Sequence, residues 1–230
     1  MKTGIYWQDP KYALRPGRGF IRGPSLVLDL PLYKLDGASF MSKDAYGHLA
    51  VVTGALWTPR GRSFDGLDDI INLGQPAALD ITEAITVEVW GKRTASTTGT
   101  LASRYDHADN EKRAWSIRWV DNNYVYFGAG GLSAHKAFAV SDRDWHHFVG
   151  TYDRAIIKLY IDTVLGVTAE GTDALLTPAI NTLIGACYNT APTLVWPFPG
   201  LIGEVRIYRG VALNLLGVQQ NYLATKWRYQ

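Results

Sequence analysis

Residues 144–166 constrain the fold more than any other stretch, and they read DWHHFVGTYDRAIIKLYIDTVLG. Side chains alternate between the two faces of a strand, and apolar residues recur at every second position on both sides of a turn at residues 152–155. The second half places Ile157, Leu159 and Ile161 on one aliphatic face. An isolated hairpin is marginal in water, so this segment needs a larger sheet and a second layer.

The same alternation continues along the chain. Strands are predicted at residues 26–32, 63–71, 81–90, 101–105, 115–119, 124–127, 182–185 and 201–208, with an Asp-Gly turn at residues 65–66 dividing the second of these. Only residues 213–226 have helical character. We therefore expect an all-β fold, a two-sheet antiparallel β-sandwich of jelly-roll type with an extended N-terminal arm and a short C-terminal helix.

The first 25 residues differ from the rest of the chain. They contain five basic residues, one acidic residue and many prolines and glycines, whereas no linker follows them. We expect an extended basic arm at 1–25 and one sandwich domain at 26–230. The arm either lies along its own domain or stays mobile, or it contacts a neighbouring subunit or an acidic partner.

Composition excludes several classes of protein. A net charge of +2 makes a nucleic-acid partner unlikely, and no apolar run is long enough to span a membrane. The single cysteine, Cys187, rules out an internal disulfide and is expected to be a small buried hydrophobe. No apolar stretch typical of a signal peptide follows Met1. We expect an extracellular or virion-associated function reached by another route, or otherwise a cytoplasmic one.

Acidic side chains give little support for catalysis. A jelly-roll glycosidase needs two carboxylates that face one groove. Glu83 and Glu88 are five residues apart and fall on opposite faces of one strand, and Glu204 is alone on its strand. We therefore expect no enzyme, and a glycosidase remains the minor alternative.

Other titratable residues have simple expected positions. His146 and His147 are adjacent on a strand, so one is expected half-buried and the other on the surface. The charged loop at residues 106–113 is expected in solvent. Loop carboxylates are either solvated or hold a structural calcium, which takes six to eight oxygen ligands. The candidate calcium ligands are Asp44, Asp65, Asp68 and Asp69.

Aromatic residues are the better clue to function, because 8 Trp and 13 Tyr exceed what a core of this size needs. Planar rings bind the apolar faces of sugars, and nearby polar groups fix the hydroxyls. Trp115, Ile117 and Trp119 share one strand face, which is either a ligand platform or the core. The loop position of Tyr188 and Trp196 favours exposure. The candidate ligand-binding residues are Trp115, Trp119, Tyr124, Tyr126, Tyr188 and Trp196, with Arg118 and Asn122 as polar contacts.

Five motifs in chain order resemble the concanavalin A-like, laminin-G-like (LamG) jelly-roll family. They are the strand at 26–32, GALW at 54–57, FDGLDD at 64–69, WHHFVGTYD at 145–153 with LYID at 159–162, and GLIGEVRIY at 200–208. Thr163 stands where the family usually has Gly, and Gly203 stands where it often has Asp.

The resemblance implies two antiparallel sheets and a lectin-like domain of the kind found in bacterial surface and phage-associated proteins. We expect a non-catalytic binding or adhesion module for a carbohydrate or a cell-surface ligand. The alternative is a structural or decoration subunit of a virion, a particle or a homo-oligomer, assembled through the N-terminal arm.

Overall fold

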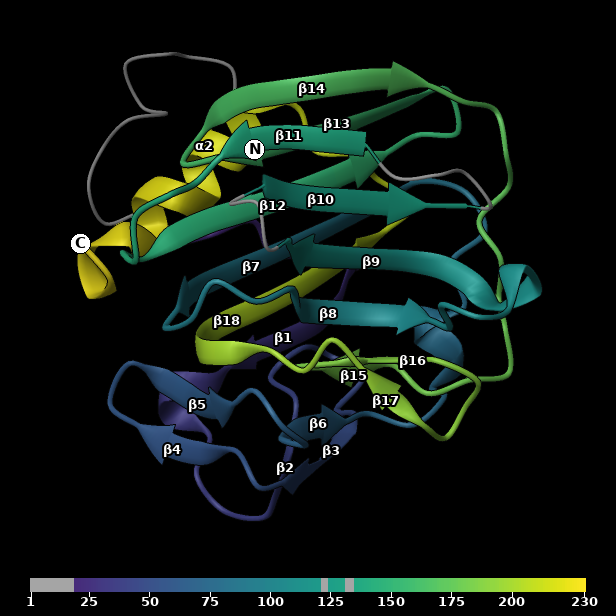
Figure 1. Cartoon of the computed structure of the whole chain (residues 1–230). Helices are drawn as coiled ribbons and strands as arrows, with labels where there is room; N and C mark the ends of the chain where they lie inside the picture. The colour runs from purple at the N-terminus through teal and green to yellow at the C-terminus, as the bar shows by residue number, and fades with distance from the viewer. Residues whose placement is uncertain (1–18, 121–123, 131–134) are drawn as a thin grey trace, which may run out of the picture.

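The computed structural model describes residues 19–120, 124–130 and 135–230, and it contains two large antiparallel sheets packed face to face (Figure 1). The front sheet in Figure 1 contains, in spatial order, β11 (His135–Ala139), β10 (Tyr124–Ala129), β9 (Arg113–Trp119), β8 (Gly99–Tyr105), β15 (Leu183–Ile184), β6 (Ile70–Asn72), β3 (Leu49–Thr53) and β2 (Ser39–Met41). The expected β-sandwich is confirmed.

The back sheet contains β14 (Val164–Glu170), β13 (Ile156–Ile161), β12 (His146–Tyr152), β7 (Ile85–Arg93), β18 (Pro199–Arg209), β5 (Gly61–Asp65) and β4 (Leu56–Thr58), and β1 (Leu26–Pro31) also pairs with β18. The short strands β16 (Cys187–Tyr188) and β17 (Leu194–Val195) form a separate hairpin. The helical elements are η1 (Leu32–Lys34), η2 (Ala77–Leu79), η3 (Asn110–Lys112), α2 (Leu215–Thr225) and η4 (Lys226–Arg228).

The core lies between the two sheets and follows the predicted alternation. Val87 and Val89 of β7 and Phe148 of β12 are buried together with Phe127 of β10. Gly150 of β12 lies opposite Phe127, and a Cβ at this glycine would be 2.2 Å from the Phe127 ring. A side chain at position 150 would therefore force the two layers apart.

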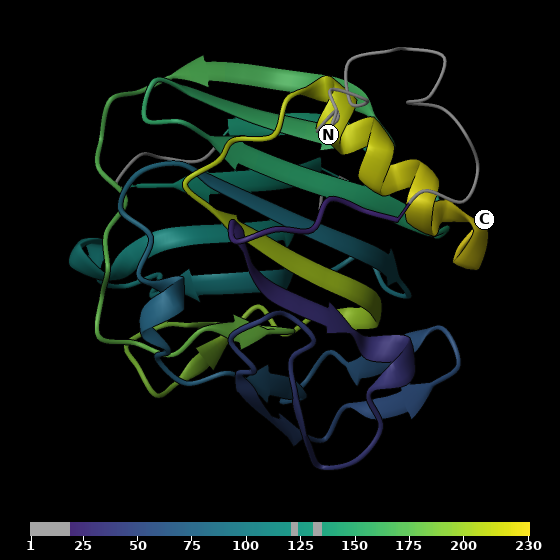
Figure 2. The same cartoon turned by 180° about the vertical axis from the view of Figure 1, so that it is seen from behind.

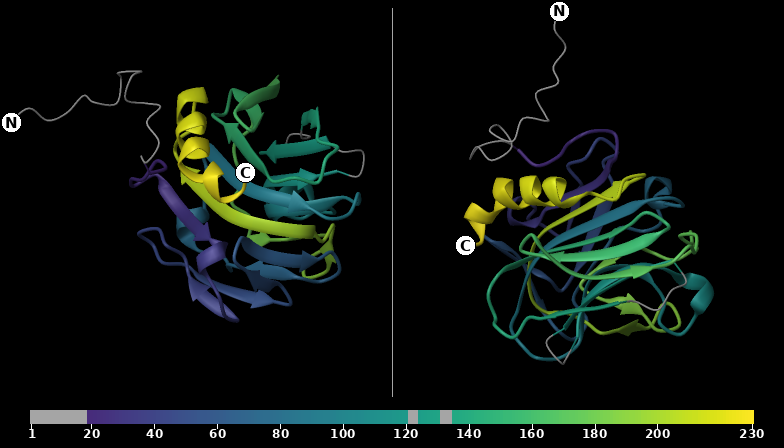
Figure 3. Two further views of the ribbon diagram at one scale, coloured as in Figure 1. Left: turned by 90° about the vertical axis from the view of Figure 1, so that its left-hand side faces the viewer. Right: turned by 90° about the horizontal axis from the view of Figure 1, so that it is seen from above.

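The outer face of the back sheet is covered by α2 and by the chain that precedes β1 (Figure 2, Figure 3). Asn214 caps α2, because its side chain accepts a hydrogen bond from the Gly217 amide at 3.0 Å. The Ile21 amide donates to Asn221 of α2 at 2.7 Å, so residues from both ends of the chain form one cover. Residues 1–18 of the predicted arm lie outside the described residues.

One loop differs from the sequence interpretation, and one turn explains an unusual residue in it. β5 and β6 flank the Asp65-Gly66 turn but lie in different sheets, since β5 pairs with β18 and β6 pairs with β3 and β15. This loop therefore crosses between the layers. In the β13–β14 turn Thr163 has a φ of 73°, in the left-handed region that favours glycine.

Candidate functional site

The outer face of the front sheet carries a hollow of about 380 Å³ over β9 and β10. Arg118 of β9 and Tyr126 of β10 are directly paired and line it, whereas their neighbours Ile117 and Phe127 point into the core. Period-two alternation therefore directs the polar and aromatic side chains of these strands outward. On the other side of the molecule α2 covers part of the back sheet (Figure 3), and a separate hollow of about 370 Å³ beside η4 is lined by Tyr33, Arg60 and Trp227 among other residues.

Three aromatic rings surround the Arg118 guanidinium in this hollow. Its central carbon lies 4.5 Å from the Trp196 ring centroid, 4.6 Å from that of Tyr126 and 5.1 Å from that of Tyr105. Arg118 is only 7% exposed, and the three rings are half-buried. This arrangement is a cation–π cluster whose ring faces border an open depression.

Asp106 fixes the loop that carries Trp196. Its carboxylate accepts hydrogen bonds from the backbone amides of Thr190 and Ala191, each at 2.8 Å. Burial alone would raise the pKa of Asp106, but these amides and that of Ala108 lower it below the usual value. The expectation that residues 106–113 lie wholly in solvent was wrong at Asp106, which is fully buried because it serves as an anchor.

The structure separates the predicted ligand-binding residues into three groups. Arg118, Tyr126 and Trp196 line the hollow together. Trp115 reaches its inner edge but is packed in the core, and Trp119 is entirely buried there, so neither offers a free ring face. The core interpretation of that strand face is therefore the correct one.

The remaining predicted ligand residues do not line the hollow. Tyr188 was expected to be exposed but is only 6% exposed, because it packs with Ile180 and Leu183 under the loop. Tyr124 is half-buried farther along β10 and is not part of the lining. Asn122 lies outside the described residues.

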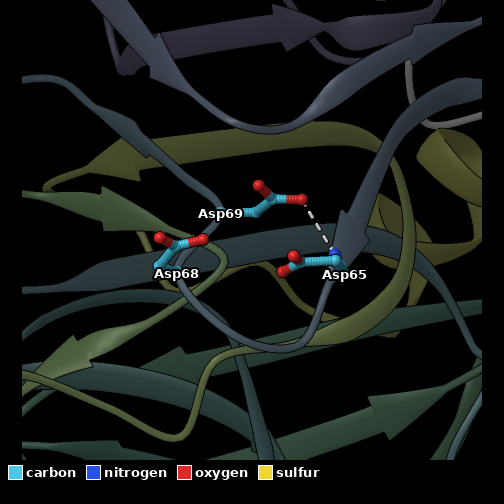
Figure 4. A group of neighbouring side chains, drawn as sticks. All are labelled: Asp65, Asp68 and Asp69. Atoms are coloured by element: carbon cyan, nitrogen blue, oxygen red, sulfur yellow. Dashed lines mark hydrogen bonds between the residues drawn. The ribbon is translucent and has the colours of Figure 1, made fainter.

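The predicted calcium ligands are divided in a similar way. Asp65, Asp68 and Asp69 offer carboxylate oxygens that lie within 4.8 Å of one another in the loop after β5 (Figure 4). Asp69 is buried, and it accepts a hydrogen bond from the Asp65 amide at 2.8 Å. Asp44 instead binds backbone amides, among them that of Asp29 at 3.0 Å. Three carboxylates suit a hard cation such as calcium, with other oxygens completing its coordination, and calcium binding stays a prediction.

A second charged cluster lies on the outer face of the back sheet and includes a contact with Asn221 of α2, and sequence reasoning did not predict it. Arg206 of β18 donates to Glu88 at 2.8 Å and also to Glu204, and Asp29 lies 3.4 Å away. His147 contacts the same Glu88 carboxylate at 2.8 Å. Glu204 was expected to be isolated because it is alone on its strand, but in the structure it contacts Arg206 and Arg228. Glu88 and Glu204 are each 1% exposed, so neither carboxylate is open to a ligand.

The two adjacent histidines point to opposite faces as predicted, but neither lies on the surface. His147 is fully buried, and the side chain of His146 is only 13% exposed. His146 lies 2.6 Å from both Asp142 and Asp162. Burial lowers the pKa of His146, but these two hydrogen bonds outweigh burial and raise it above the usual value. Cys187 is buried as expected, and burial raises the pKa of its thiol to about 11.

Residues 65–215, well over half of the chain, match a laminin-G-type family model described as the concanavalin A-like lectin/glucanases superfamily. The chain belongs to this superfamily. A comparison with curated protein sequences found no match. None of the described helices has the length and apolar character needed to cross a membrane.

Solved structures share the fold of this concanavalin A-like domain. Domain 4 of AbnA, a GH43 extracellular arabinanase from Geobacillus stearothermophilus solved in complex with arabinotriose, is 18% identical with a TM-score of 0.63, and the alignment covers 87% of this chain and 98% of that one. The binding domain of Paraclostridial mosquitocidal protein 1 is 12% identical with a TM-score of 0.63, over 86% of this chain and 52% of the other.

An enzyme is also among the similar structures. Trypanosoma rangeli sialidase is 15% identical with a TM-score of 0.63, and the alignment covers 90% of this chain but only 34% of the sialidase. At these identities the likeness shows the fold alone.

Three residues of the hollow were missed by sequence reasoning. Tyr105 ends β8, His107 follows it, and Arg113 begins β9. The Arg113 guanidinium lies 5.5 Å from the Tyr105 ring centroid, and it donates to the His107 carbonyl. Their loop was interpreted as solvated charge, and only the pairing of β8 with β9 places it beside Arg118.

Proposed function

We propose that this concanavalin A-like domain is a non-catalytic carbohydrate-binding module and that the hollow on the front sheet holds the sugar. The observation that carries the proposal is the convergence of Tyr105, Tyr126 and Trp196 around one depression on the uncovered sheet. Aromatic faces bind the C–H faces of a pyranose or furanose ring, and the adjacent Arg118 supplies hydrogen-bond donors.

The similarity to a domain solved with arabinotriose supports a glycan ligand, and the similarity to the binding domain of Paraclostridial mosquitocidal protein 1 supports a binding function. A glycan displayed outside the cell fits the proposed adhesion function, in an extracellular or virion-associated setting. The proposal assigns no catalytic step to Glu88 or Glu204, since Arg206 binds both and both are buried.

The test begins with a broad glycan array, and isothermal titration with arabinotriose and with the best array ligand follows. Trp196→Ala removes one wall of the hollow, and we expect it to weaken binding about tenfold. Trp57→Ala is the matched control, because Trp57 is 40% exposed in β4 outside the hollow. Absence of binding to every sugar at millimolar concentration would refute the proposal, as would equal loss in both variants.

Self-assembly is the second candidate function, favoured by an apolar strip at the edge of the front sheet. Met41 of β2 pairs with Leu49 of β3, and both are exposed together with Val51. An exposed apolar edge of this kind suits contact with another copy or with a particle. Light scattering of wild-type protein and of Leu49→Ser tests it, and a wild-type monomer at all concentrations would exclude self-association.

A further inference from the structure

The described lining of the hollow carries positive charge and no carboxylate. Arg118 and Arg113 contribute guanidinium groups, and His107 contributes an imidazole. Burial lowers the pKa of His107 below its usual value, and the nearby charges of Arg113 and Arg118 lower it further. The two guanidinium groups therefore make the described lining cationic, although the whole chain has a net charge of only +2.

Arg118 is a buried cation whose donors lack a protein acceptor. Its Nε is buried without a hydrogen-bond partner, and its guanidinium makes no hydrogen bond or ion pair with any residue that the structure describes. The three surrounding rings compensate part of the charge but accept no conventional hydrogen bond. Burying a charge without an acceptor is costly, so an acceptor from a ligand recovers free energy at this point.

The other buried arginines show what this chain normally provides. Each of them donates to oxygen atoms of the protein, and none has its charge compensated by rings alone. Arg62 donates to the Leu35, Ala55 and Gly37 carbonyls, Arg93 to that of Val140, Arg104 to those of Leu79 and Pro178, and Arg206 to Glu88 and Glu204. Arg118 differs from all of these, and it is the one that faces an open depression.

We propose that the hollow selects sugars that carry a carboxylate and that Arg118 pairs with this carboxylate while the rings hold the sugar. A guanidinium is planar and matches a carboxylate through two parallel hydrogen bonds. The Tyr126 and Trp196 rings lie 4.6 and 4.5 Å from the central carbon of the guanidinium and accept none of its N–H groups in a conventional hydrogen bond, so these donors remain for the ligand. Arg113 at the half-exposed rim adds attraction for the same charge. This inference deepens the proposed carbohydrate function and depends on it.

The experiment compares an acidic oligosaccharide with its neutral methyl ester and with a sulfated sugar. Trigalacturonate and its fully methyl-esterified form are titrated calorimetrically into the wild-type protein at low salt, beside a sulfated trisaccharide. We expect the acid to bind about tenfold or more tightly than the neutral ester, because charged hydrogen bonds exceed neutral ones. The sulfated sugar is expected to bind more weakly than the carboxylate, and tighter binding of the sulfate would overturn the choice of a carboxylate.

Variants then assign the preference to Arg118. Arg118→Gln should abolish the difference between acid and ester, Arg118→Lys should retain part of it, and Arg60→Gln, an exposed arginine outside the hollow, should keep it fully. Arg113→Gln provides a half-exposed variant with little folding risk, and it should reduce the difference. Thermal melting establishes that each variant is folded.

The outcomes separate this inference from the proposed function. If the ester binds as tightly as the acid, or if Arg118→Gln keeps the preference, carboxylate selection is wrong and the carbohydrate module stands. If no sugar of any kind binds, both are wrong.

Discussion

Two buried arginines on opposite faces of the sandwich show how differently one fold uses the same side chain. Arg206 is 1% exposed on the back sheet, where Glu88, Glu204 and Asp29 surround it and the Phe20 ring centroid lies 3.8 Å from its central carbon. Arg118 is 7% exposed on the front sheet, where it meets rings and no described carboxylate. A buried cation that is paired with carboxylates contributes to the stability of the fold. A buried cation without such partners can bind an anionic ligand.

Residues of α2 and η4 cover part of the back sheet. Trp90 of β7 donates to Thr225 of α2 at 2.8 Å and packs against the Tyr229 ring with centroids 4.6 Å apart. Arg228 donates to Glu204, so the C-terminal residues also contribute charge to the cluster. Hydrogen bonds between buried polar groups and the packing of aromatic rings together hold the C-terminal residues against the back sheet.

The strongest test of the comparison removes each cation in turn. Arg206→Met removes the guanidinium that Glu88, Glu204 and Asp29 share. Arg228 still contacts Glu204 and His147 still contacts Glu88, but the buried cation is lost, and the change should lower the free energy of unfolding by about 3–5 kcal/mol. Arg118→Met removes only cation–π contacts and should lower it by no more than about 2 kcal/mol. Urea denaturation followed by circular dichroism measures both. Equal losses would show that Arg118 is as structural as Arg206.

Acid unfolding tests the counter-charges themselves. Burial raises the pKa of Glu88, but Arg206 and His147 outweigh it and lower this pKa from 4.5 to about 2. Because the pKa of Glu88 is lower in the folded than in the unfolded state, the ionised carboxylate stabilises the fold above pH 4.5. This contribution of about 3 kcal/mol is lost as the pH falls toward 2. The free energy of unfolding, measured by urea between pH 2 and 6, should fall steeply for wild type and less steeply for Glu88→Gln. Parallel curves would contradict the lowered pKa.

Gly203 tests whether the C-terminal residues close the back face. A Cβ at this position would lie 2.4 Å from the Tyr229 ring, so Gly203→Ala should overpack the contact and cost about 1–3 kcal/mol of stability. Gly19→Ala is the matched control, since nothing lies within 4 Å of its Cβ position. In a Tyr229→Ala background the cost should disappear. A cost that persists there would place the strain elsewhere.

The acidic cluster has the opposite charge to the Arg118 site, and its expected effect on stability is the smallest of the four. Asp65, Asp68 and Asp69 form no ion pair with a basic side chain among the described residues. Burial raises the pKa of Asp69, which marks a carboxylate that lacks a compensating charge. Calcium at millimolar concentration should raise the melting temperature by about 2–4 °C relative to EDTA. Asp68→Asn should remove this shift, and an unchanged wild-type melting temperature would count against calcium.

The sequence predicted most of the strands because their alternation is local. Patterns within about a dozen residues predict three of the observed elements. They are the β12–β13 hairpin with its turn at residues 152–155, the β9–β10 hairpin and the helix that begins near residue 215. Of the candidate site, Arg118, Tyr126 and Trp196 were identified correctly. Tyr105, His107 and Arg113 were missed because their loop reaches the hollow only through strand pairing.

The sequence by itself determined that this chain forms two β layers and which side chains of a strand share a face. The tertiary structure decided which face is core, which is covered and which is open, because alternation gives two faces without saying what packs on either. Ile21 and Asn221 must meet to close the back sheet, and the loop at residues 188–198 must reach Asp106 to bring Trp196 over Arg118. Contacts between such distant segments depend on the packing of the whole chain, which no local pattern encodes.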